Sequence, residues 1–292
     1  MTREELIERI TQEVIRTLKD LESSGGASVP SEDVRPLVEG TLLDLTQEEY
    51  KDLIQLDDPV NPLALRAMER ATTARIGIGR SGERLTTKAL LSLRADHAMA
   101  KDAVLKAVDE SLLADLDLHV VQSKCQDIDE HLTRPDLGRQ LSDEGAAWIK
   151  DHCLANPQVQ VYVSDGLSNA AIENNIRDCL PILLDGLKDK GLRVGTPFFV
   201  KYGRVPTLDA VSELTGAEVT CVLIGERPGL AASDSMSAYI TYGAHVGILE
   251  SKRTVVSNIH KNGIQPVEAG AYLVDLLEKV FTEKKSGVDL KL

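Results

Sequence analysis

The chain has 292 residues, enough for one large domain with appendages, and a formal net charge of −13 at pH 7 with a pI near 5.0. This acidity excludes nucleic acid and anionic membranes as general partners. No apolar stretch is long enough to span a membrane, and the charged N-terminus is unlike a secretory signal, so we expect a cytoplasmic protein.

An amphipathic helix is predicted at the N-terminus, over residues 1–22, because apolar side chains recur there at helical spacing. Residues 23–36 begin with a run of serine and glycine and are predicted to be a flexible linker. A helix tethered in this way either packs onto the body or a sister subunit, or serves as a docking tag for another protein. Spacing alone does not decide between these alternatives.

A small helical subdomain is predicted over residues 37–110, with helices at 63–73 and 86–108. The apolar side of the second helix is expected to consist of Leu90, Leu93, His97, Val104 and Leu105.

A glycine-rich stretch at residues 77–82 lies between these two helices and has the pattern G-x-G-x-x-G. A dinucleotide site needs a buried strand directly before the first glycine, and residues 69–75 are not one. We therefore interpret the stretch as a basic, structural loop, and a nicotinamide-dependent oxidoreductase built on it is the alternative function.

Residues 111–292 are predicted to form an α/β domain with a doubly wound, mainly parallel, Rossmann-like sheet. Its short apolar runs lack alternation, which is typical of strands covered on both faces. The expected strands are 118–122, 159–164, 194–201, 219–224, 238–241, 246–249 and 254–258. The expected helices are 135–153, 168–190, 208–215 and 267–284.

Three loops that follow predicted strands, at residues 164–168, 202–206 and 225–229, are the expected place of function. In such sheets ligands bind beyond the carboxyl ends of the strands. Glu226 is flanked by Gly225 and Pro228, so its carboxylate is displayed and can accept hydrogen bonds from an amide-bearing ligand. A simple turn residue is the alternative, and the spacing leaves both open.

A self-contained catalytic or metal-binding set is not found in the sequence. Asp129-Glu130-His131 resembles the start of the Asp-x-His-x-x-Gly box with which some cobalamin proteins offer a histidine to cobalt, but Arg134 stands at the glycine position. The other histidines have no carboxylate or cysteine at metal-ligand spacing. We predict no catalytic and no metal-binding residue on this chain.

Several motifs, in order along the chain from about residue 70 to the C-terminus, resemble a single family, the small (light) subunit of ethanolamine ammonia-lyase. The matching segments are 76–83, 90–108, 132–139, 164–168, 194–200, 225–229, 257–260 and 266–269. The resemblance implies an adenosylcobalamin-dependent enzyme, a carbon–nitrogen lyase that converts ethanolamine to acetaldehyde and ammonia. It also implies a large subunit, a barrel that supplies the substrate pocket, while the small subunit clamps the cofactor.

The resemblance places cofactor contacts on Val205, Glu226 and Val255. The position of Val255 is a cysteine in some relatives, so a contact through the backbone is implied there. Members of the family keep the cofactor's own base on cobalt, which agrees with the incomplete histidine box.

Housing in a bacterial microcompartment is also implied, with an N-terminal helix on a linker as the packing signal. This favours the docking tag for residues 1–22, with a shell protein as its partner inside the bacterial cytoplasm. A non-enzymatic scaffold subunit remains a further alternative.

Overall fold

The computed structural model describes residues 56, 58–72 and 74–291. The predicted N-terminal helix (1–22), the linker (23–36) and the first part of the helical subdomain (37–55) lie outside the described residues. The boundary expected near residue 110 stays a prediction. Within the described part of the chain, no helix combines the length and the apolar character that crossing a membrane requires.

The first described elements are helix α3 (Pro62–Arg70), a two-stranded hairpin of β1 (Arg80–Ser81) and β2 (Arg84–Leu85), and helix α4 (Thr87–Leu105). The glycine-rich stretch leads into this hairpin, and residues 74–79, directly before β1, are not in a strand. The strand–turn–helix context of a dinucleotide site is therefore missing.

The inward face of α4 differs from the one predicted. The helix buries Ala89, Asp96, Ala100 and Ala103, whereas Leu105 is 55% exposed. The prediction gave weight to large side chains, but small alanines are the residues that let neighbouring segments approach closely. Asp96 is the one charged residue among these buried positions, and its carboxylate forms an ion pair with Arg75.

The body of the protein is a six-stranded, mostly parallel sheet in the order β3-β5-β4-β6-β7-β8. The first four strands in this order are parallel, and β7 and β8 are antiparallel to their neighbours. The strands are β3 (His119–Gln122), β4 (Val159–Ser164), β5 (Phe198–Lys201), β6 (Val219–Gly225), β7 (Met236–Tyr242) and β8 (Thr254–Ile259). Every residue of β4 and β6 is buried, the polar Gln160 and Thr220 included, which agrees with the prediction of strands covered on both faces.

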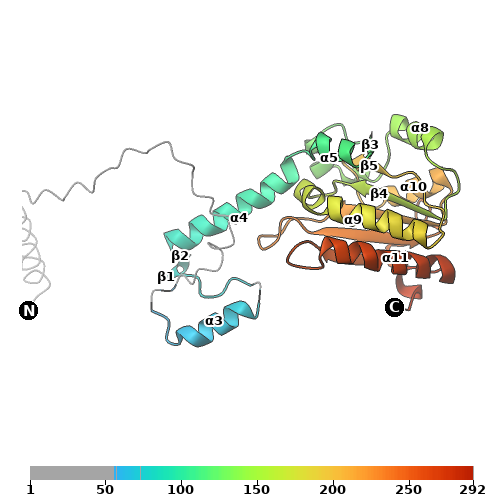
Figure 1. Cartoon of the computed structure of the whole chain (residues 1–292). Coiled ribbons are helices and arrows are strands. Elements are labelled where there is room, and N and C mark those ends of the chain that lie inside the picture. Colours follow the sequence, from blue (N-terminus) through green and yellow to red (C-terminus); the bar gives the residue numbers. More distant parts are fainter. Residues whose placement is uncertain (1–55, 57, 73, 292) are drawn as a thin grey trace, which may run out of the picture. The chain divides into compact units, whose positions relative to one another are not determined.

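Helices cover both faces of the sheet (Figure 1), which confirms a mixed α/β fold with a mainly parallel sheet. The long α9 (Asn169–Asp189) packs beside α11 (Pro266–Glu283) on one face, near the short α5 (Glu110–Asp115). The opposite face carries α8 (Asp143–His152) and α10 (Thr207–Thr215). α9 begins where the Ser168 hydroxyl accepts the N–H of Ala171, at 3.1 Å.

Three local predictions differ from the structure. The helix expected over 135–153 is split into α7 (Pro135–Gly138) and α8, with Ser142 as the N-cap of α8. Residues 194–197 precede β5 instead of extending it, and 246–249 form a turn instead of a strand. The elements that were not predicted are the hairpin of β1 and β2, the helices α5 and α6 (Ile128–Thr133), and the 3-10 turns η1 (Glu250–Lys252) and η2 (Gly287–Asp289).

The sheet has a topological switch point between the neighbouring parallel strands β4 and β5. The connection from β4 runs through α9 on one face, while the connection from β5 runs through α10 on the other face. Loops that diverge in this way leave a crevice at the carboxyl ends of the two strands. The order of the parallel strands differs from that of a dinucleotide-binding Rossmann sheet, so the Rossmann-like description is not confirmed.

Candidate functional site

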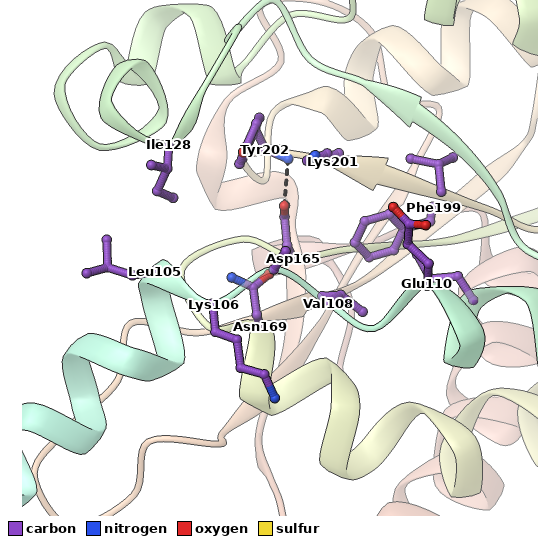
Figure 2. Close-up of a pocket in the computed structure, with 13 residues that line it drawn as sticks. Leu105, Lys106, Val108, Glu110, Ile128, Asp165, Asn169, Phe199, Lys201 and Tyr202 are labelled. Carbon is purple, nitrogen blue, oxygen red and sulfur yellow. Dashed lines mark hydrogen bonds between the residues drawn. The ribbon is translucent and has the colours of Figure 1, made fainter.

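A buried carboxylate, Asp165, joins the two loops that border this crevice. It follows β4 and accepts the backbone N–H of Tyr202 at 2.7 Å (Figure 2). It also accepts the backbone N–H of Gly203 at 3.2 Å. Burial raises the pKa of Asp165 to about 7, against the lowering effect of these N–H donors. Asp165 therefore holds the loop after β5 in place.

A small cavity of about 150 Å³ opens beside Asp165 (Figure 2). Its wall includes Phe199 and Lys201 of β5 together with Asn169 at the start of α9. Asn169 donates a hydrogen bond to the carbonyl oxygen of Val104 at 3.0 Å, so it ties α4 to α9. The cavity can hold a few waters and is too small for a cofactor.

The histidine of the incomplete cobalt box, His131, is buried and serves the architecture of the crevice. Its Nδ1 lies 3.1 Å from the carbonyl oxygen of Tyr202, and its Nε2 lies 2.5 Å from that of Gly166. Arg204 donates from Nη2 to the carbonyl oxygen of His131 at 2.6 Å. His131 thus connects α6 with the loops after β4 and β5, and both ring nitrogens are occupied by the protein.

The loops after β4 and β6 touch through their backbones. The N–H of Leu167 donates to the carbonyl oxygen of Gly225 at 2.9 Å. A Cβ atom added at Gly225 would lie 2.2 Å from the carbonyl oxygen of Ser168 and 2.4 Å from that of Asp165. Only glycine permits this approach, so Gly225 fixes where the next residue, Glu226, leaves the sheet.

Glu226 is half-buried and has a defined hydrogen-bond partner. Its Oε1 accepts the hydroxyl of Tyr239, on the neighbouring strand β7, at 2.8 Å. Burial and the adjoining Glu226 carboxylate raise the pKa of Tyr239 to about 12, so the phenol stays a donor at neutral pH. A carboxylate accepts about four hydrogen bonds, and Glu226 therefore keeps acceptor capacity for a ligand.

The other two residues implied by the resemblance lie on the same face of the sheet as this tyrosine. Val255 on β8 is the direct cross-strand partner of Tyr239 and is 45% exposed. Val205, in the loop before α10, packs on the hydrophobic cluster that also contacts Tyr239. The structure thus gathers Val205, Glu226 and Val255 on the α8/α10 face of the sheet.

A buried ion pair connects the strand of Val255 with the helix that follows Val205. Arg253 donates from Nη1 and Nη2 to the two carboxylate oxygens of Asp209 on α10, at 2.8 and 2.9 Å. Its Nε donates to Glu250 at 2.7 Å. Because Arg253 and Asp209 are 2% and 6% exposed, this fork fixes β8 relative to α10.

A larger groove lies at the same carboxyl edge, with a volume of about 660 Å³. Arg204 after β5 and Arg227 after β6 contribute to its lining, together with His97 and Lys101 of α4. The other side chains that line the groove are apolar. Among the residues described, no group of three or more histidine, cysteine or acidic side chains is arranged to hold a metal ion.

The sequence indicated Glu226 but gave no sign of Tyr239 or of the basic groove. Tyr239 becomes relevant only through the antiparallel register of β6, β7 and β8, which places it beside Glu226 and Val255. The groove combines α4 with the loops that contain Leu167, Arg204 and Arg227, which lie far from α4 along the chain. Both depend on three-dimensional packing.

The fold and its edge loops define an α/β protein with its candidate site beyond the carboxyl ends of the parallel strands. A family model described as "Ethanolamine ammonia-lyase light chain (EutC)" matches residues 63–291. The curated ethanolamine ammonia-lyase small subunit of Fusobacterium nucleatum is 54% identical over 254 residues, which is 87% of this chain and 86% of that protein.

Two clostridial proteins with the same description are also similar. The Clostridium tetani small subunit is 46% identical over 289 residues, 98% of each chain. The Clostridium perfringens small subunit is 46% identical over 280 residues, 96% of this chain and 92% of that protein. The chain belongs to the ethanolamine ammonia-lyase light chain family and is a lyase subunit.

Proposed function

We propose that this chain is the small subunit of an adenosylcobalamin-dependent ethanolamine ammonia-lyase and clamps the cofactor against a large catalytic subunit. The reaction would convert ethanolamine to acetaldehyde and ammonia. The observation that carries the proposal is that Glu226 and Val255 both adjoin Tyr239, and that Val205 packs on the same hydrophobic cluster as Tyr239. These residues are far apart in the sequence and belong to three different segments.

The chemistry of these residues fits a corrin ring. A corrin carries side-chain amides that donate hydrogen bonds, and the Glu226 carboxylate is a strong acceptor with capacity left. Val205 and Val255 supply apolar surface for the ring, and 45% of Val255 is exposed. Tyr239 and Gly225 keep the carboxylate in one orientation before the cofactor arrives, which reduces the entropy lost on binding.

In this proposal the reaction itself takes place on the large subunit, and this chain binds the cofactor. When bound, the cofactor supplies the radical that initiates the reaction. This chain's residues would bind and orient the corrin and exclude water from one side of it. His131 takes no part in cobalt binding in this proposal, because both of its ring nitrogens contact backbone carbonyl groups.

The N-terminal segment is proposed to be a packing signal for a bacterial microcompartment in the cytoplasm. The apolar stripe of residues 1–22 and the linker at 23–36 support this role. A shell protein would be the partner of that helix.

Reconstitution tests the proposed function. The large subunit alone, the large subunit with this chain, and this chain alone are each assayed with ethanolamine and adenosylcobalamin. We expect acetaldehyde formation only when both chains are present. Full turnover without this chain would identify it as a non-enzymatic scaffold, and turnover that depends on a nicotinamide dinucleotide would favour the oxidoreductase.

A further inference from the structure

Tyr202, the first residue after β5, has a backbone conformation that bulky side chains rarely adopt. Its φ is 58°, in the left-handed region, where the Cβ atom of an L-residue crowds the backbone. Among the described residues it is the only aromatic one with a positive φ. The others besides glycine are Asp117, Asn156, Asn258 and Lys284. A strained residue of this kind persists only where the surrounding structure holds it in place.

The surrounding structure binds Tyr202 through its own N–H and through the peptide group that joins it to Gly203. The two N–H groups donate to the two oxygens of Asp165, at 2.7 Å from Tyr202 and at 3.2 Å from Gly203. The carbonyl oxygen of Tyr202 lies 3.1 Å from Nδ1 of His131. Asp165 and His131 are 4% and 1% exposed, so water does not compete for these contacts. Buried hydrogen bonds therefore impose the left-handed conformation.

The turn at Tyr202 determines where the following residues lie. A Cβ atom added at Gly203 would lie 2.5 Å from the hydroxyl oxygen of the last residue of β4, so the chain passes directly against that strand. The N–H of Arg204 then donates to the carbonyl oxygen of Gly138, the last residue of α7, at 2.8 Å. Val205 comes next. The conformation of Tyr202 thus sets the position of Val205 relative to the sheet.

We propose that Tyr202 is a positioning residue for the loop at 202–206, and that Asp165 is the latch that maintains its strained conformation. The loop then has two states. With both hydrogen bonds to Asp165 the left-handed conformation is the stable one, because two bonds to a buried carboxyl group outweigh the strain of one residue. Without them Tyr202 returns to a negative φ, and the loop moves away from α7. The latch lies within this chain, whereas its use in placing Val205 against the corrin rests on the proposed function.

Hydrogen exchange of the Arg204 amide, measured by NMR on the full chain, reports the state of the loop. This amide donates to Gly138 and not to Asp165, so it loses protection only when the loop moves. Asp165→Ala should accelerate its exchange by roughly tenfold, because the strain at Tyr202 then drives the loop into the second state. In a Tyr202→Gly background the same substitution should accelerate it by less than about threefold, since glycine adopts a left-handed conformation without strain.

Lys284→Gly is the matched control, because it removes a side chain at a φ of 55° from another element, the exposed end of α11. In that background Asp165→Ala should again accelerate the exchange by roughly tenfold. Equal acceleration in the native and Tyr202→Gly backgrounds would overturn the latch, and so would a Lys284→Gly background that suppresses the acceleration. Should Asp165→Ala fold poorly, Asp165→Asn, which loses one acceptor oxygen, replaces it with the same expected order of effects.

Cobalamin titration of the assembled complex tests the use of the latch. Asp165→Ala should weaken cobalamin binding by roughly tenfold in the native background and by less than about threefold in the Tyr202→Gly background. Equal losses in the two backgrounds would contradict the positioning role. If the native complex binds no cobalamin, the proposed function fails and the placing of Val205 against a corrin fails with it, while the exchange measurements still decide whether the latch exists.

Discussion

Tyr239 acts on the proposed cofactor site through Glu226. Its hydroxyl donates to Glu226 Oε1 at 2.8 Å, and its raised pKa, about 12, keeps it a donor over the physiological range. It is therefore a positioning residue: it limits the orientations of the carboxylate. Without the hydroxyl, the carboxylate would sample several rotamers before binding.

Tyr239→Phe should weaken cobalamin binding by roughly two- to tenfold, because one neutral hydrogen bond to a charged acceptor is lost. Cofactor titration of the assembled complex measures this change. In a Glu226→Gln background the same substitution should have almost no further effect, since the group that Tyr239 orients has already lost its charge. Additive losses in the double variant would contradict the positioning role.

Asp165 is expected to make the stability of the fold depend on pH. Its pKa is raised by burial to about 7, so the folded chain holds a proton that the unfolded chain releases near pH 4. The contribution of Asp165 to stability is therefore complete below about pH 4 and is lost as the pH rises through about 7. Over that window the loss amounts to roughly 4 kcal/mol at most.

Urea unfolding at a series of pH values tests this expectation. The native chain should lose stability between pH 4 and pH 7 more steeply than Asp165→Asn, which does not titrate. Asp151→Asn, an exposed position on α8, is the control and should follow the native curve. Parallel curves for the native and Asp165→Asn chains would mean that the Tyr202 and Gly203 N–H groups keep Asp165 ionised throughout.

At the scale of elements, the three strand-end loops form one unit. The loops after β4 and β6 touch through main-chain atoms, and the Asp165 side chain binds the loop after β5. Gly225→Ala would place a methyl group 2.2 Å from the Ser168 carbonyl oxygen and 2.4 Å from the Asp165 carbonyl oxygen. We expect a destabilisation of about 1–3 kcal/mol and a weaker affinity for the cofactor, because Glu226 would shift with the backbone. Denaturant unfolding and cofactor titration measure the two effects.

Gly229→Ala is the control in the same loop, since its Cβ would meet only the Ala232 carbonyl oxygen, at 3.4 Å. It should change neither quantity measurably. Equal effects of the two substitutions would mean that loop flexibility, and not the close approach at Gly225, determines the geometry of the site.

The long elements were predictable because burial and periodicity act locally. β4 is a short, mainly apolar run and was predicted with its observed bounds, and α9 was predicted to within one residue at each end. The face of α4 was wrong because side-chain size was used to assign burial, whereas the buried positions are mainly alanines. The turn at 246–249 was taken for a strand because a short apolar run has no distinctive period.

The candidate site was only partly predictable. Glu226 has a local signal, a carboxylate between glycine and proline at the end of a strand. Val205 and Val255 were named through the family resemblance, because an isolated valine carries no functional signal. Tyr239 and Gly225 gain their roles from strand register and loop contacts, which a single sequence does not specify.

At the scale of the whole molecule, the N-terminal segment is expected to be separable from the enzyme. Deletion of residues 1–28 should leave assembly and lyase activity largely intact, because the family model matches residues 63–291 and so does not include this segment. It should abolish co-purification with microcompartment shells and increase solubility, since an apolar stripe favours association. A truncated chain that fails to fold or to pair with the large subunit would show that this segment belongs to the body.

The central claim is that this chain holds the cofactor through Glu226, and cobalamin titration of the assembled complex tests it most directly. Glu226→Gln keeps the size of the side chain and one acceptor oxygen but removes the charge. We expect cobalamin affinity to fall roughly tenfold, near 1.4 kcal/mol, with the substrate KM unchanged at saturating cofactor. Glu144→Gln, on the exposed surface of α8, should bind cobalamin like the native chain. Unchanged affinity of a normally assembled Glu226→Gln complex would contradict the claim and leave Glu226 as a turn residue.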